Sequence, residues 1–189
     1  FYIAQRVVKS AYQSVKELDA SMNKIAVVTE MTTKDLWDQI DAYNKLASAM
    51  GATVKGSYDV AKLYYQQGKS TKDVNTLTTE TLKLARISGL EYGQATDFMT
   101  SALNGFKLEV KDASRVSDIY SNLAAKAAVD TQEIAYAMTK TDSIAKNAGM
   151  SIENTAAMLT QMMETTREAP ENIGTAMKTI IARFAEMKE

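Results

Sequence analysis

The chain contains no cysteine and no histidine among its 189 residues. Without them, disulfide bonds, thiolate nucleophiles, zinc sites of the Cys–His type and serine–histidine–aspartate triads are all excluded. Proline occurs once and glycine eight times, while apolar residues make up 46% of the chain. This composition favours helices over strands. The sequence therefore predicts an all-α protein that is not an enzyme and that binds no cofactor and no metal ion.

The chain also has no large excess of charge of one sign. Its 22 lysines and arginines nearly balance its 23 aspartates and glutamates, which gives a net charge of −1. A broad basic surface for nucleic acid is therefore not expected. The longest stretch without a charged residue, Asn154–Met163, is well short of the ~20 apolar residues that span a membrane. Arg6 and Lys9 interrupt the N-terminal apolar region, which excludes a signal peptide there. Because the first residue is Phe1 rather than methionine, we expect the sequence to be part of a longer chain.

Apolar and small residues recur at alternating spacings of three and four near the N-terminus. These residues are Phe1, Ala4, Val8, Ala11, Val15, Leu18, Met22 and Ile25. The period of 3.5 predicts a long coiled-coil-like helix over residues 1–30. We expect self-association into a homo-oligomer, for example a trimer, along a seam formed by Val8, Ala11, Val15, Leu18, Met22 and Ile25. The alternative is a single amphipathic helix that packs on its own domain.

Residues 31–189 are predicted to form a helical core domain of about eight short antiparallel helices. Helix starts are indicated by Thr32 with Asp35, Ser70 with Asp73, Asp112 or Ser114, Asp130 with Glu133, Ser151 and Pro170, and one further helix is expected from about Ser57 to Gln67. The glycines expected to end helices in turns are Gly51, Gly68, Gly89 and Gly149. The stretch Gly51–Gly56 is interpreted as a turn between two helices.

The core domain also contains an internal similarity. Ala85–Leu90 aligns with Ala145–Met150, Phe98–Met99 aligns with Met158–Leu159, and Val116, Tyr120 and Leu123 align with Ile173, Met177 and Ile180. The pattern predicts a duplicated unit of helix, glycine turn, helix, loop and helix, over about residues 70–128 and 130–188. Such units usually stack, because one alone cannot bury its apolar face.

Candidate chemistry is sparse. The carboxylate pairs Asp38 with Asp41 and Glu164 with Glu168 are close neighbours on a helix, and we interpret them as solvated surface residues rather than as a catalytic pair across a cleft. The apolar residues Met158, Leu159, Met162 and Met163 could form a flexible groove, but a buried core face is the preferred interpretation. The apolar faces of two other helices include Ile87 in one and Ile180, Ile181 and Phe184 in the other.

Several motifs, in this order, resemble the conserved core of phage tail tape measure proteins over roughly residues 15–185. They are Glu17–Ile25, Val28–Thr29, Thr33-x-x-Leu36, Gly51–Thr53 with Ala61 and Gly68, Leu82–Ala85, Ala95–Phe98, Ala113-x-x-Val116-x-Asp118, Ala145-x-x-Ala148–Ser151 and Gly174–Ala176. Each motif is a helix cap or a small-residue packing position, so the order and spacing carry the resemblance.

The resemblance implies a structural virion protein in the lumen of a phage tail, assembled in the bacterial cytoplasm. It implies a role in tail length determination and genome ejection, with tail tube and tail tip proteins as partners and no small-molecule substrate. Because glycines and caps interrupt the helices repeatedly, we expect this segment to be a folded section rather than the stretch that measures length.

Two other functions stay open from the sequence alone. One is a helical-repeat adaptor that would be monomeric and bind an extended peptide along its methionine-rich face. The other is a pore-forming or envelope-interacting helical protein, which would expose apolar helices on contact with lipid.

Overall fold

The computed structural model of the chain describes residues 31–187 together with residues 9, 16, 19–20, 22–27 and 29. All of the described residues before residue 30 are helical. The rest of the helix expected over residues 1–30 lies outside the described residues.

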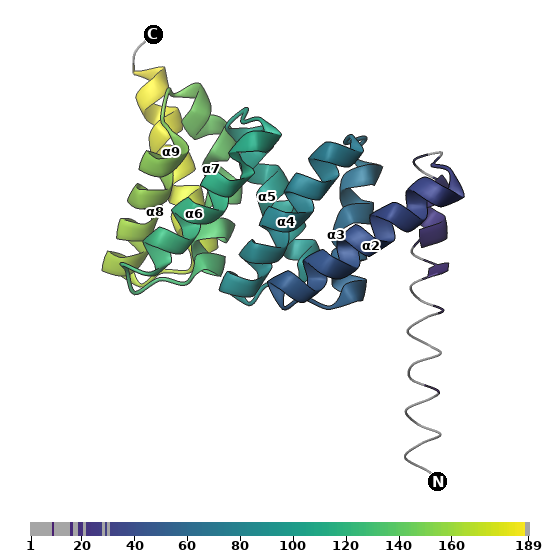
Figure 1. The fold of residues 1–189 in the computed structure, drawn as a ribbon. Coiled ribbons are helices and arrows are strands. Elements are labelled where there is room, and N and C mark those ends of the chain that lie inside the picture. Colours follow the sequence, from purple (N-terminus) through teal and green to yellow (C-terminus); the bar gives the residue numbers. More distant parts are fainter. Residues whose placement is uncertain are drawn as a thin grey trace. The chain divides into compact units, whose positions relative to one another are not determined.

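Helices make up most of the described part of the chain, and residues 31–187 contain no strand. The α-helices are α2 (Thr33–Met50), α3 (Val54–Gln66), α4 (Thr71–Ser88), α5 (Tyr92–Gly105), α6 (Ala113–Ala124), α7 (Thr131–Asn147), α8 (Ile152–Thr166) and α9 (Pro170–Glu186), and a short 3₁₀ helix, η1 (Val110–Asp112), precedes α6 (Figure 1). The all-α fold class is confirmed.

Local hydrogen bonds explain where most helices begin. The Thr32 hydroxyl accepts a hydrogen bond from the backbone N–H of Asp35 at 3.2 Å, and the Ser151 hydroxyl accepts one from the N–H of Asn154 at the same distance. Each bond satisfies an N–H group that has no partner inside the helix. Pro170 is the first residue of α9, where its missing N–H costs nothing. The helix starts predicted at these positions are confirmed.

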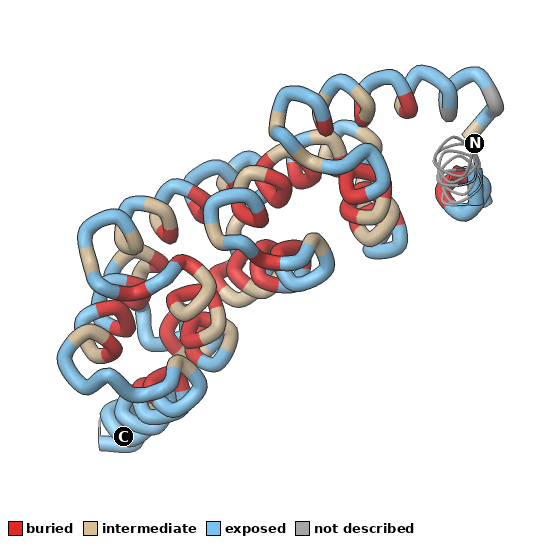
Figure 2. The backbone as a smooth tube through the Cα atoms, turned by 90° about the horizontal axis from the view of Figure 1, so that it is seen from below, coloured by how far each residue is buried: buried red, intermediate tan, exposed pale blue. Residues whose placement is uncertain are grey.

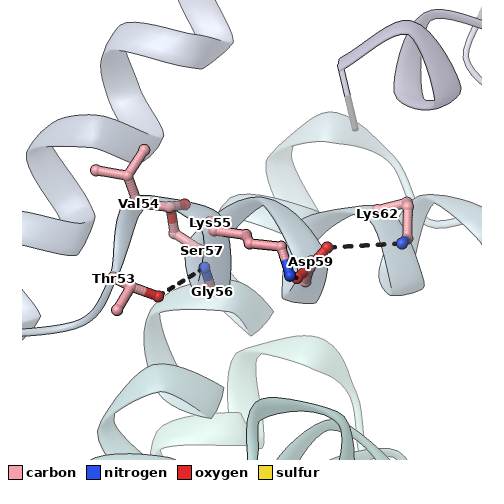
Figure 3. Close-up of polar contacts among 7 residues, drawn as sticks. All are labelled: Thr53, Val54, Lys55, Gly56, Ser57, Asp59 and Lys62. Carbon is pink, nitrogen blue, oxygen red and sulfur yellow. Dashed lines mark hydrogen bonds and ion pairs between the residues drawn. The ribbon is translucent and has the colours of Figure 1, made fainter. Parts of the chain in front are cut away.

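The predicted turn over Gly51–Gly56 is wrong at its second half. Helix α3 begins at Val54, three residues before the expected start near Ser57, so only the first part of the stretch connects α2 to α3. The Thr53 side chain accepts a hydrogen bond from the Gly56 N–H at 3.0 Å and so forms the cap of α3 (Figure 3). Gly56, expected in the turn, is a buried residue of the first helical turn.

The described helices divide into two compact units, the first ending at Leu82 and the second beginning at Lys83, both within α4. This division differs from the domain boundary expected after residue 30, which stays a prediction. In the first unit, α2 packs against α3. The rings of Tyr43 and Tyr58 meet edge to face with centroids 5.7 Å apart, and the Tyr58 hydroxyl donates a hydrogen bond to the carbonyl of Ile40 at 3.1 Å.

The second unit is organised around α7, which contacts α5, α6, α8 and α9. Figure 2 shows buried residues concentrated on the sides where these helices face one another. The buried residues of α7 are Thr131, Ile134, Ala135, Ala137, Met138, Thr141, Asp142 and Ala145. Small residues allow a close approach at one crossing: Gly174 of α9 lies against the backbone of Ala137. Helix α7 is thus the core helix of this unit.

Three residues expected on apolar helix faces are exposed instead. Ile87 in the last turn of α4 is 53% exposed, and Ile180 and Phe184 of α9 are 43% and 62% exposed. In α9, the neighbouring positions Met177 and Ile181 are buried. The apolar stripe of α9 is therefore wider than the surface that the second unit covers, and helical periodicity alone does not show this.

Candidate functional site

An apolar groove of about 600 Å³ opens between α8, α9 and the C-terminal end of α7. Its lining residues are Asn147, Ala148, Met150, Met158, Met177, Ile180, Ile181, Phe184 and Ala185. Met177 and Ile181 are buried and form its floor, whereas Met158 and Phe184 are 49% and 62% exposed. Asn147 is the one lining residue with a polar side chain. This lining suits contact with apolar groups and offers no acid, base or nucleophile.

The methionine face of α8 is divided between core and groove. Leu159 and Met163 are buried, as expected. Met158 is exposed and lines the groove, and Met162 is half-buried. The interpretation of all four residues as one buried face is therefore wrong for Met158, because α8 faces the core with only part of its apolar surface.

The predicted self-association seam is described only at its C-terminal end. Met22 and Ile25 are 8% and 1% exposed, so both are covered by other residues of the same chain. Val8, Ala11, Val15 and Leu18 lie outside the described residues. The seam stays a prediction.

The four glycines expected in turns each follow a helix, with φ angles between 63° and 81° at Gly51, Gly68, Gly89 and Gly149. At Gly51 this left-handed conformation directs the N–H group back to the carbonyls of Ala47 and Ser48 at the end of α2. Glycine adopts it without the steric cost of a Cβ atom. These glycines shape the connections between helices and take no part in a groove or a buried polar cluster.

Asp142 forms a buried polar cluster that the sequence analysis missed. It is 3% exposed on α7, and its Oδ2 atom accepts a hydrogen bond from the Ser101 hydroxyl of α5 at 3.1 Å. Burial raises the pKa of Asp142 from 3.8 to about 7, and the hydrogen bond from Ser101 lowers it in part. A signal was present in the sequence, because Asp142 occupies the same helix face as the apolar residues Ile134, Met138 and Ala145.

The other carboxylates considered above lie at the surface. Asp38, Asp41 and Glu168 are exposed, Glu164 is half-buried, and the Lys45 ammonium lies 2.6 Å from the Asp41 carboxylate. Within the described residues, no group of three or more acidic side chains is placed to hold a metal ion. Among the described helices, none combines the length and the apolar character that crossing a membrane requires.

A family model described as Phage-related minor tail protein matches residues 40–189, which include all of the second unit. The chain belongs to the phage-related minor tail protein family. The chain is also similar to the Tape measure protein of Pneumococcus phage Dp-1, with 25% identity over 174 residues. That alignment covers 90% of this chain and 15% of the relative. The resemblance to tail tape measure proteins is thereby confirmed.

No solved structure matches the chain. Both the apolar groove and the Asp142 cluster lie inside the residues that the minor tail family model covers.

Proposed function

We propose that the chain is a structural section of a tail tape measure protein that lies in the lumen of the phage tail tube. There it takes part in tail assembly, in length determination by the whole protein and in genome ejection, and it catalyses no reaction. The observation that supports this function is the family match over residues 40–189, together with the alignment of 90% of the chain to a tape measure protein. Tail proteins are components of the virion, which agrees with this location.

The same proposal assigns the chain to a folded section and not to the part that measures length. The α-helices of residues 31–187 have 12 to 18 residues each. At ~1.5 Å per residue, the longest of them reaches only ~27 Å. Turns separate successive helices, and α7 contacts both α8 and α9, so the helices fold back instead of adding their lengths. The expected helix over residues 1–30 would lead from this folded section into an extended part.

Self-association belongs to the proposal, because several copies in a narrow tube would align side by side. The 3.5-residue period between Val8 and Leu18 is the sequence feature that supports it. Tail tube and tail tip proteins are the other partners that we propose.

The seam can be tested by light scattering on the 189-residue chain. Leu18→Glu places a charge in the seam and should convert an oligomer into a monomer. Gln13→Glu adds the same charge outside the seam and should leave the oligomer intact. A wild-type chain that is monomeric at high concentration, or a Leu18→Glu variant that still associates, would contradict the seam.

We also propose that residues 70–128 and 130–188 are duplicated units. Helices α4, α5 and α6 follow the same order as α7, α8 and α9, with a left-handed glycine after the first helix of each set, Gly89 and Gly149. This order of elements supports the duplication.

The alternative function is a peptide-binding adaptor, which would use the apolar groove between α8, α9 and the end of α7. The family match favours the tail protein, because it covers most of the chain and names a tail component. The two functions differ in the mass of the isolated chain. An adaptor is expected to be monomeric, whereas the proposed tail section is expected to associate.

A further inference from the structure

The carboxyl group of Asp142 lies in the second unit, where α5 and α6 pack against α7. Its Oδ2 atom accepts the hydrogen bond from the Ser101 hydroxyl, but Oδ1 is buried without a hydrogen-bond partner. A buried neutral oxygen without a partner is costly, and a buried carboxylate without sufficient donors costs considerably more. The observed arrangement therefore suits the protonated acid better than the anion.

Helix α5 covers Asp142 closely. A Cβ atom at Gly105, one turn beyond Ser101, would overlap with the Cβ atom of Asp142. The two helices thus pack so closely that position 105 has no room for a side chain. Hydration of the Asp142 carboxylate would require α5 to move away from α7.

Few titratable groups act on Asp142 from the helices around it. From α6, the buried phenol of Tyr120 interacts with it, and the pKa of Tyr120 is raised by burial and by the charge of Asp142. From α5, the only contribution is the Ser101 hydrogen bond, and no charged group of α8 or α9 contributes within the described residues. Burial and the Ser101 hydrogen bond are the two influences on the pKa of Asp142, and no lysine or arginine of the described residues, those of α7 included, adds to them.

We propose that Asp142 is the proton-binding element of a pH-sensitive latch between α5 and α7. When Asp142 is protonated, the carboxyl group carries no charge, Oδ2 still accepts the hydrogen bond from the Ser101 hydroxyl, and α5 stays packed on α7. When the proton leaves, the buried anion has one donor, the Ser101 hydroxyl at Oδ2, and none at Oδ1, so α5 separates from α7 to admit water. The latch is a property of the second unit and does not depend on the proposed tail function.

The direction of the pH effect follows from the two pKa values. The pKa of Asp142 is about 7 in the folded chain and close to 3.8 when the carboxyl group is exposed to water. The closed state therefore binds one more proton than the open state between these values. The fraction of open molecules should rise about tenfold per pH unit between pH 5 and pH 7 and should level off above pH 7.

Hydrogen exchange of peptides from α5 and α7, measured on the 189-residue chain by mass spectrometry and corrected for intrinsic exchange rates, tests the latch. The wild-type chain should show the tenfold change per pH unit. Asp142→Asn has no ionisable group at this position, so its open fraction should be independent of pH. Asp118→Asn, which removes an exposed carboxylate from α6, should behave like the wild type.

Ser101→Ala provides a second variant that retains Asp142. The hydrogen bond from Ser101 lowers the pKa of Asp142, so its loss should shift the levelling-off point to higher pH. A wild-type open fraction that does not change between pH 5 and pH 7 would overturn the proposal. A levelling-off point unchanged in Ser101→Ala would overturn it as well, even if Asp142→Asn fails to fold.

Discussion

Replacing Gly174 by alanine should destabilise the second unit, even though alanine is the better helix former. Gly174 is buried in α9 at its crossing with α7. A Cβ atom at this position would lie 2.6 Å from the carbonyl oxygen of Ala137 and 2.9 Å from the Cβ atom of Lys140. Favourable contacts between carbon atoms lie at ~3.5–4.0 Å. Because the nearest atom belongs to the backbone of α7, the two helices would have to separate.

The magnitude follows from two opposing terms. Overpacking of a well-packed core costs ~1–3 kcal/mol, whereas alanine in place of glycine inside a helix contributes ~1 kcal/mol of stability. The contact with rigid backbone places the cost in the upper part of its range, so we expect the free energy of unfolding to fall by about 1–2 kcal/mol. For a unit of this size, ~1 kcal/mol corresponds to a change in Tm of ~4–8 °C.

Gly93→Ala is the matched control. Gly93 is exposed in α5, and no atom lies within 4 Å of the position of its Cβ atom. Alanine there should raise the free energy of unfolding by ~0.4–1 kcal/mol. Far-UV circular dichroism during thermal and urea unfolding measures both variants. A Gly174→Ala chain as stable as the Gly93→Ala chain would refute the close packing of α7 and α9.

Two further predictions concern the groove and the first unit. Met177 is 2% exposed, so Met177→Ala should lower the free energy of unfolding by ~2–5 kcal/mol, whereas Phe184→Ser, at a residue that is 62% exposed, should change it by ~0.5 kcal/mol or less in the same urea titration. Burial raises the pKa of Tyr58 from 10 to about 12, and it raises the pKa of Tyr43 by more than that of Tyr58. Both phenols therefore hold their protons more tightly in the folded chain than in the unfolded one, so the chain should lose stability as the pH rises above 10 toward 12. Ultraviolet absorbance should then show phenol ionisation in two separate phases, and a single phase near pH 10 would contradict the burial of both rings.

Helix boundaries could be predicted from the sequence because the interactions that fix them are local. The acceptor side chains of Thr32 and Ser151 lie within three residues of the N–H groups that they bind. Gly89 and Gly149 mark helix ends through their own backbone conformation. The start of α3 is an exception: Thr53 is a cap of the same kind, but the glycine at position 56 favours a continued turn when only the sequence is considered.

The candidate site could not be predicted to the same extent, because it depends on contacts between helices distant in sequence. Periodicity identified the apolar face of α9, but only the packing of α7 and α8 decides that Met177 is covered and Phe184 is not. The short distance between Gly174 and α7 likewise has no signature in one sequence. Asp142 was recognisable as a carboxylate on an apolar face, but its partner Ser101 lies 41 residues away.

The most direct test of the proposed function is tail length in particles whose tape measure gene lacks residues 130–188. If these residues measured length as a continuous helix, their loss would shorten the tail by ~90 Å, at ~1.5 Å per residue. A folded structural section predicts a different result in electron micrographs: tails that fail to assemble or lack their tips, with no population shortened by that amount. Complete, infectious tails shortened by ~90 Å would contradict the account.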